Sequence, residues 1–229
     1  MPRRPRLVVP EVPLHIIQRG NNRNNCFFSH SDYQAYLGML KESADAAECQ
    51  VHAYVLMTNH VHLLVTPLHE RSASELMKST GERYVQFVNR RYGRAGTLWQ
   101  GRYRSCLVQD EIYFMVCQRY IEMNPVRAGM VTNPALHKWS SHRAYAYGDA
   151  NPVITPHSLI DGLGLNKTSR QIAYRSLFDQ VIPSGTVEHL RQATNGNFAF
   201  GDDAFATCMR EKVGRQVARI NAGAPNVDS

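Results

Sequence analysis

Two histidines in one apolar segment are the first residues with chemical potential. His60 and His62 are two positions apart in the β-rich run HVHLLVTP. Successive side chains of a strand point to opposite faces, so these two imidazoles are expected on the same face. Two imidazoles side by side could bind a metal ion, although such a pair in a sheet is more often purely structural. The pair therefore needs support from other residues.

A tyrosine and an asparagine supply that support. Tyr120 and Asn124 are four positions apart in a predicted helix, so their side chains share a face. A divalent cation on His60, His62 and the Asn124 amide oxygen could polarise a phosphate that Tyr120 attacks. The alternatives are a buried aromatic role for Tyr120 and a helix cap at Asn124, which could also be both cap and ligand.

The elements that must position these residues follow from hydrophobic periodicity. Strands are predicted at 14–20, 51–57, 60–67 and 105–108, and helices at 31–47, 72–92 and 110–124. Ser31 is the expected N-cap of the first helix, and Pro125 should end the third near Asn124. The order favours an α+β, ferredoxin-like fold: a four-stranded antiparallel sheet with helices on one face, and the third helix presenting Tyr120 near the sheet.

The chain divides into three predicted regions. Residues 1–12 form a basic N-terminal arm, residues 13–150 form the domain with the candidate site, and residues 151–229 form a mainly helical C-terminal extension. In that extension, helices are predicted near 167–180 and 187–194 and in the stretch after Phe200. The extension is expected to pack beside the first domain and either to help hold DNA or to mediate self-association.

Composition narrows the class of protein. The chain of 229 residues is 43% hydrophobic and 20% charged, and it lacks an apolar run near the roughly 18 residues that span a bilayer. No membrane partner and no secretory signal are expected, which favours the cytoplasm. The five cysteines form no CxxC pair, so reduced thiols are expected and a structural zinc is not.

The net charge of +7 favours an anionic partner. Arginine guanidinium groups suit phosphates, and planar rings can stack on unpaired bases, so a single-stranded nucleic acid is a natural ligand. The candidate DNA-binding residues are Arg3, Arg4, Arg6, Arg19, Asn22, Arg23, Arg94, Trp99, Arg102, Tyr103, Arg104 and Arg127. Each group has a structural alternative. The first three arginines could form a solubilising tail, and Asn22 and Arg23 a plain turn. Trp99 could be a structural tryptophan beside solvated arginines.

Three motifs together resemble a known family. The segments VLMTNHVHLLV, LWQGRYRS and RYIEMNPVRAGMV are similar in order and spacing to the REP-associated tyrosine transposases, a branch of the HUH single-strand endonucleases. The resemblance spans residues 12–150 and implies that His60, Val61 and His62 form the histidine-hydrophobic-histidine triplet of an HUH catalytic domain. It also implies Mg²⁺ or Mn²⁺ as cofactor, with Asn124 where related enzymes often have a glutamine ligand.

The resemblance implies a reaction and a substrate as well. Tyr120 would become joined to a 5′-phosphate of DNA and release a 3′-hydroxyl, which permits strand transfer at palindromic, REP-like hairpins on the nucleoid. Tyr113 lies seven residues earlier near the same face, but the resemblance selects Tyr120. Two alternatives remain: a non-catalytic DNA-binding regulator, and a hydrolytic metal phosphoesterase in which Tyr120 is structural. A monomer and a homodimer are both compatible with the sequence.

Overall fold

A single mixed sheet organises the molecule. The computed structural model describes residues 6–218. Its strands are β1 (Leu14–Arg19), β2 (Cys49–Leu56), β3 (His60–Pro67), β4 (Arg104–Val108) and β5 (Ala199–Phe200), in the order β2-β3-β1-β4-β5. The first four pair antiparallel, which confirms the ferredoxin-like arrangement. The unexpected fifth strand pairs parallel with β4.

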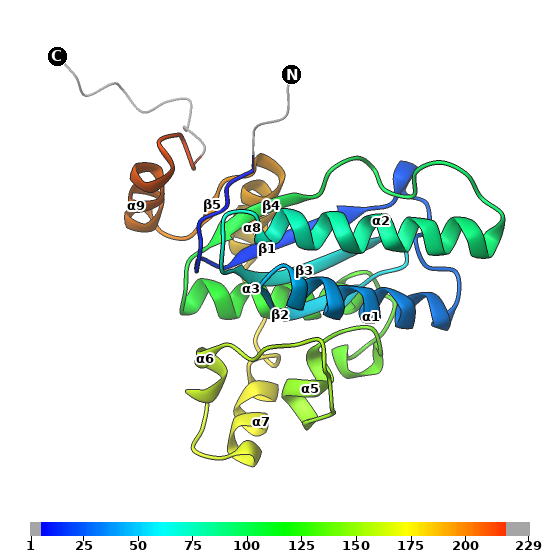
Figure 1. The fold of residues 1–229 in the computed structure, drawn as a ribbon. Helices are drawn as coiled ribbons and strands as arrows, with labels where there is room; N and C mark the ends of the chain where they lie inside the picture. Colours follow the sequence, from blue (N-terminus) through cyan, green and yellow to red (C-terminus); the bar gives the residue numbers. More distant parts are fainter. Residues whose placement is uncertain (1–5, 219–229) are drawn as a thin grey trace.

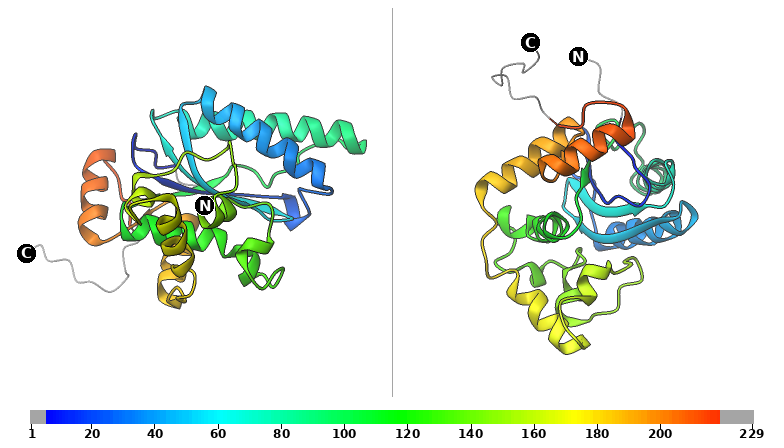
Figure 2. Two further views of the ribbon diagram at one scale, coloured as in Figure 1. Left: turned by 90° about the horizontal axis from the view of Figure 1, so that it is seen from below. Right: turned by 90° about the vertical axis from the view of Figure 1, so that its left-hand side faces the viewer.

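Two helices pack on one face of the sheet, as predicted, and the third helix and a helix of the C-terminal extension cover the other face (Figures 1 and 2). One layer is α1 (His30–Ala46) and α2 (Ser72–Tyr92), and the other includes α3 (Ile112–Glu122) and α8 (Ser184–Gly196). The second layer follows from β3, where Val61 and Leu63 contribute to the core under α1 and α2 while Leu64 contributes to the core under α3. Strands buried on both sides require a helix layer on each side.

Local signals explain where the helices begin and end. The first helix begins one residue after Ser29, not Ser31, because the Asp32 carboxylate accepts the backbone N–H of Ser29 at 2.9 Å in a capping box. The predicted N-cap was therefore wrong by two residues. Helix α3 ends at Glu122, and Pro125 lies inside the separate short helix α4 (Asn124–Arg127). This confirms the predicted stop before the proline.

The C-terminal extension is mainly helical, as predicted, and returns to the sheet. The remaining elements are η1 (Asn21–Arg23), η2 (Pro134–Leu136), α5 (His142–Tyr147), α6 (Ser158–Asp161), α7 (Lys167–Ser176) and α9 (Asp203–Val213). Helix α8 packs against β4 and β1, and β5 extends the sheet beyond β4. All five cysteines are free thiols, as expected. None of the helices within residues 6–218 is long and apolar enough to cross a membrane.

A buried polar network ties α3 to the region that follows it. The Glu122 carboxylate is fully buried and accepts hydrogen bonds from the hydroxyls of Ser141 at 2.6 Å and Tyr174 at 2.7 Å. The same carboxylate contacts His142 Nδ1 at 2.9 Å. Because Ser141 and His142 lie at the start of α5 and Tyr174 lies on α7, the network fixes the end of α3 against both helices.

Removal of the Glu122 carboxylate is expected to be strongly destabilising. The Glu122→Ala change leaves three buried polar partners without their acceptor, so the free energy of unfolding should fall by about 3–5 kcal/mol. Urea unfolding measures this difference, and Glu82→Ala on the exposed side of α2 is the matched control. A Glu122→Ala variant as stable as the control would show that the network does not hold α3.

Candidate active site

The sheet brings three histidines to the α3 side. On β1, Leu14 and Ile16 belong to the core under α1 and α2, so His15 points to the opposite side, toward α3. His62 pairs with Ile17 across the strands, which puts His15 diagonally beside it. The His60 and His62 rings are 5.0 Å apart between centroids, in an edge-to-face arrangement. The two histidines therefore lie together, as the strand periodicity predicts.

One nitrogen of each predicted ligand is occupied and the other is available. His62 Nδ1 lies 2.9 Å from His15 Nε2, and His60 Nδ1 lies 2.6 Å from the Asn59 side-chain oxygen. His15 Nδ1 in turn lies 2.9 Å from the Thr194 hydroxyl. The Nε2 atoms of His60 and His62 make no hydrogen bond within the part of the chain that the structure describes. Both rings are thus held through Nδ1, with Nε2 left for a ligand.

Tyr120 lies against the histidines. Its ring centroid is 5.9 Å from that of His62 and 5.8 Å from that of His15, both edge-to-face. The Arg127 guanidinium covers the other side of the phenol, 3.9 Å from the ring centroid. Tyr113, by contrast, packs against Phe200 in the second core. Of the two tyrosines on α3, Tyr120 is the one beside the histidine pair.

Asn124 makes cap-like contacts. Its amide nitrogen donates to the carbonyls of Tyr120 and Ile121, each at 3.1 Å. Its side-chain oxygen accepts a hydrogen bond from Arg127 at 2.8 Å. Arg127 also donates to the Tyr120 carbonyl at 2.9 Å. The oxygen that would serve as a third metal ligand therefore faces a cation here, and Arg127 would have to release it before it could bind a metal.

Burial keeps the histidines uncharged at neutral pH. Desolvation lowers the pKa of His15 to about 3, and the Arg127 cation adds to the effect. Desolvation also lowers the pKa of His60 to about 4, with a further contribution from Arg19. The pKa of His62 is lowered well below 6.5 by burial first and then by its charged neighbours. Neutral imidazoles keep the lone pairs that a metal ion requires.

The lowered pKa values of the buried histidines predict that acid destabilises the folded protein. Burial lowers the pKa of His15 to about 3, of His52 to about 4 and of His60 to about 4. The unfolded chain binds protons on these residues below pH of about 6.5 while the folded chain does not, so the free energy of unfolding should fall as the pH drops toward 4. Each residue contributes up to about 1.4 kcal/mol per pH unit. Urea unfolding at pH 7, 6 and 5 measures the slope, and a flat profile contradicts it.

The donor set suits a metal ion only in part. Two Nε2 atoms on one face are typical ligands of divalent transition metals. Within residues 6–218, no cluster of three or more His, Cys, Asp or Glu side chains is arranged to hold a metal. A closed structural site is therefore not formed, and an ion on His60 and His62 would take its other ligands from Asn124, phosphate or water. Such an open coordination sphere is typical of catalytic sites.

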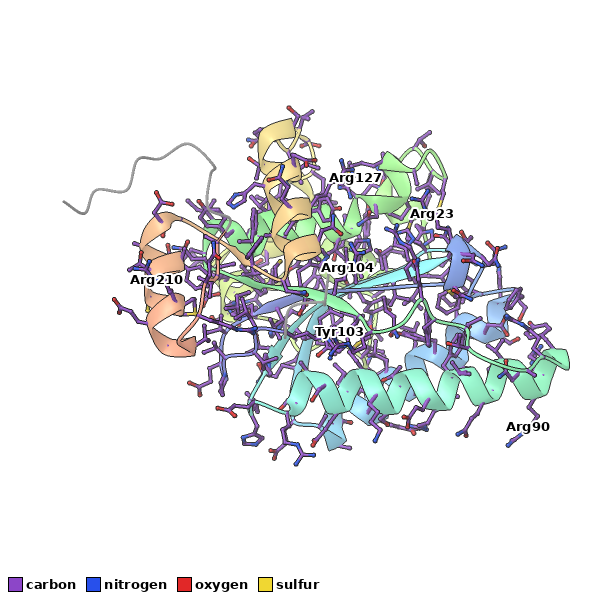
Figure 3. The ribbon with its side chains drawn as sticks, turned by 90° about the horizontal axis from the view of Figure 1, so that it is seen from above. Arg23, Arg90, Tyr103, Arg104, Arg127 and Arg210 are labelled. Carbon is purple, nitrogen blue, oxygen red and sulfur yellow. The ribbon has the colours of Figure 1, made fainter. Side chains whose placement is uncertain are left out.

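Arginines surround the site. Arg19, at the end of β1, is close enough to Arg23, Arg104 and Tyr120 to interact electrostatically with all three. In Figure 3, Arg23, Arg104 and Arg127 gather around the central part of the molecule, whereas Arg90 lies at the far end of α2 and Arg210 on α9. A cavity of about 250 Å³ adjoins Arg104 and is lined by Arg6, Arg102, Asn195 and Asn197 among others. This basic surface would attract a phosphate backbone.

The aromatic candidates are not exposed platforms. Trp99 is 5% exposed and packs against Tyr36 and Tyr84 in the core, and Tyr103 is 7% exposed under the Arg6 guanidinium. Both rings contribute their apolar faces to the core in this structure, and stacking on bases stays a prediction. Their neighbour Arg102 is exposed.

The other candidates are distributed as follows. Asn22 and Arg23 are exposed in η1, both with positive φ angles, and Arg94 lies after α2 with its guanidinium 5.6 Å from the Phe28 ring centroid. Arg3 and Arg4 lie outside the described residues. The sequence did not point to His15 or to Arg191 of α8, which both lie beside the site. Strand alternation shows that His15 faces away from Leu14 and Ile16, but the face that it occupies is known only when the core has been identified. Arg191 interacts electrostatically with Arg127. No sequence signal identified Arg191.

Comparisons with solved structures agree with this fold. A REP-associated tyrosine transposase bound to a REP hairpin matches with a TM-score of 0.52 and 18% identity, over 69% of this chain and 93% of that chain. A crystal structure assigned to a transposase of Deinococcus radiodurans R1 matches with a TM-score of 0.37 and 21% identity, over 52% of this chain and 95% of the other. The first likeness supports the fold, and the second is too distant to add to it.

The sequence itself carries the family assignment. No curated protein matches the chain significantly. A family model described as "Transposase IS200 like" matches residues 8–124, which include His60, His62, Tyr120 and Asn124. That span covers half of the chain and runs from before β1 to the end of α3. The resemblance inferred from the three motifs is confirmed at this level, and the protein belongs to the IS200-like transposase family.

Proposed function

We propose that this transposase is a metal-dependent endonuclease and strand transferase of single-stranded DNA that acts on REP-like hairpins. The single observation that carries the proposal is the position of the Tyr120 ring, 5.9 Å from the His62 ring, which itself lies 5.0 Å from the His60 ring. A potential nucleophile thus lies beside two imidazoles whose Nε2 atoms are available. Residues 13–150 would form the catalytic domain and residues 151–229 the extension that supports it.

The chemistry follows from these positions. His60 and His62 would hold a divalent cation such as Mg²⁺ or Mn²⁺, which would supply polarisation of a phosphate oxygen and stabilisation of the charge that develops in the displacement. The Tyr120 oxygen forms a bond to phosphorus, and the bond from phosphorus to the 3′-oxygen breaks. Tyr120 loses its phenolic proton, and the leaving 3′-oxygen gains a proton to become the 3′-hydroxyl. The 5′-phosphate stays on Tyr120. Attack by another 3′-hydroxyl reverses the step and joins strands without an external energy source.

The surrounding cations support this reaction. Arg127 covers the phenol ring at 3.9 Å, and Arg19 is close enough to Tyr120 to interact with its charge. Both guanidinium groups would interact favourably with the negative charge of an approaching phosphate. Arg23, Arg102 and Arg104 would bind the flanking backbone, since they are exposed on the same basic surface. Such a protein would act on the nucleoid.

The substrate in the proposal is a palindrome folded as a hairpin with unpaired flanking bases. The related structure with similar fold holds a REP hairpin, and the basic surface here suits such a ligand. The full-length protein should be incubated with a pool of labelled hairpin oligonucleotides and Mn²⁺ or Mg²⁺, then resolved on a denaturing gel. A labelled covalent adduct with hairpin but not with fully paired duplex supports the proposal.

Other outcomes point to the alternatives. Cleavage without an adduct would indicate hydrolysis by water with Tyr120 structural. Binding without adduct or cleavage, over the whole oligonucleotide pool and with both metals, would indicate a DNA-binding regulator. Size-exclusion chromatography of the protein with and without hairpin would distinguish a monomer from a homodimer.

A further inference from the structure

We propose that Thr194 of α8, acting through His15, sets which nitrogen of His62 carries the proton and so leaves Nε2 of His62 bare for the metal ion. This inference deepens the proposed function and rests on it, because it assigns a role toward the proposed metal site. It makes a helix of the C-terminal extension, outside the residues matched by the family model, part of the site. Thr194 and His15 would be positioning residues.

The side chain of Thr194 is fully buried beside His15. Its hydroxyl donates to the Leu190 carbonyl at 2.8 Å. A hydroxyl has one proton and two lone pairs, so the oxygen can only accept from its other partners. His15 Nδ1, at 2.9 Å, must therefore be the protonated nitrogen of its ring. The Cys106 sulfur at 3.2 Å fits the second lone pair, because burial raises the pKa of this thiol to about 12 and keeps its proton in place.

The tautomer of His15 in turn fixes the tautomer of His62. A neutral imidazole carries one proton, so with Nδ1 protonated the Nε2 of His15 is an acceptor. Nε2 of His15 lies 2.9 Å from Nδ1 of His62, which must then be the donor. A neutral His62 has one ring proton, and the hydrogen bond to His15 uses it on Nδ1. Its Nε2 is left with a free lone pair on the side of the site.

Reversing one proton would reverse the outcome. If Thr194 donated to His15 instead, His15 would donate from Nε2 to His62, and His62 would carry its proton on Nε2. A protonated Nε2 cannot bind a metal ion. The bond from Thr194 to Leu190, four residues earlier in the same helix, uses the hydroxyl proton and so favours the first arrangement. Partners outside the ligand shell commonly fix the tautomer of metal-binding histidines, and their loss typically weakens metal affinity about 10–100-fold.

The test uses the full-length protein without DNA. Two-bond ¹H–¹⁵N correlation spectra of protein with ¹⁵N-labelled histidine report which ring nitrogen of His62 is protonated, with a His62→Gln spectrum for assignment. The wild-type protein is expected to show the Nδ1-protonated form. Thr194→Val, which removes the hydroxyl but keeps the shape, should shift His62 to the Nε2-protonated form. It should also weaken Mn²⁺ binding about 10–100-fold in an EPR titration.

Thr194→Ser is the matched control because it keeps the hydroxyl and should retain both the wild-type tautomer and the wild-type Mn²⁺ affinity. An Nε2-protonated His62 in the wild-type protein would overturn the inference without any variant. So would an unchanged tautomer in folded Thr194→Val, or equal losses in both variants. Since neither readout needs DNA or cleavage, this inference can fail while the adduct assay succeeds. The tautomer can also be as expected in a protein that forms no adduct.

Discussion

Replacement of Tyr120 by phenylalanine is expected to abolish the covalent protein–DNA adduct and to lower the cleavage rate by at least about 10⁴-fold. The change removes the only atom that would attack phosphorus and leaves the ring between His62 and Arg127 in place. The fold should persist, because the ring keeps its contacts with the histidines and only the interaction of its hydroxyl with the Arg127 side chain is lost. Single-turnover cleavage of a labelled hairpin gives the rate, and a denaturing gel detects the adduct.

The matched control for this variant is Tyr113→Phe. It makes the same chemical change on the same helix, but the Tyr113 ring packs against Phe200 and not against the histidines. Tyr113→Phe should keep the adduct and the wild-type rate. If Tyr113→Phe lost the adduct and Tyr120→Phe kept full activity, Tyr113 and not Tyr120 would be the nucleophile. Cleavage by Tyr120→Phe at the wild-type rate would leave water as the attacking group.

Loss of the histidine pair should have the next largest effect. His60→Ala or treatment with a chelator is expected to lower cleavage about 10³-fold, which corresponds to about 4 kcal/mol of transition-state stabilisation. His60 lies at the start of β3 and is only partly buried, so its loss should spare the fold. Mn²⁺ or Mg²⁺ added back to chelated wild-type protein should restore cleavage in the same assay. Such recovery would show that the chelator removed the metal ion and did not damage the protein.

The surface residue His69 provides the control for the histidine change. Its ring pairs with Glu48 and its side chain is 65% exposed, away from the buried histidines. His69→Ala should cleave hairpins at the wild-type rate and respond to the chelator as the wild type does. Full activity of His60→Ala would contradict a metal ion on His60 and His62. So would full activity of chelated protein that is shown to hold no residual metal.

Local periodicity was enough to predict the central elements. The alternation in HVHLLVTP correctly put His60 and His62 on one face, and the helix at 72–92 was predicted to the residue. Its end is marked by Gly93, whose positive φ of 59° stops the helix in the way glycine commonly does. Pro125 likewise marked the end of α3. Each of these features is set by neighbours a few residues away, which a single sequence displays.

What the sequence could not show depends on distant partners. The strand β5 is two residues long and exists only through its pairing with β4. His15 and Thr194 are 179 positions apart, and no local pattern connects a histidine in a strand with a threonine in a late helix. The burial of Trp99 could not be predicted for a related reason, since a loop next to arginines does not reveal that its indole packs in the core against Tyr36 of α1 and Tyr84 of α2. Tertiary packing determines each of these outcomes.

The late position of α8 has a consequence for synthesis on the ribosome. His60, His62 and Tyr120 emerge long before Thr194, and domains generally fold from the N-terminus as the chain emerges. If Thr194 holds His15 as inferred, a nascent or prematurely terminated chain has Tyr120 and both histidines of the proposed site but lacks the residue that would set the proton arrangement on His62. Such a fragment would bind metal weakly and so spare the chromosome from nicking by unfinished protein.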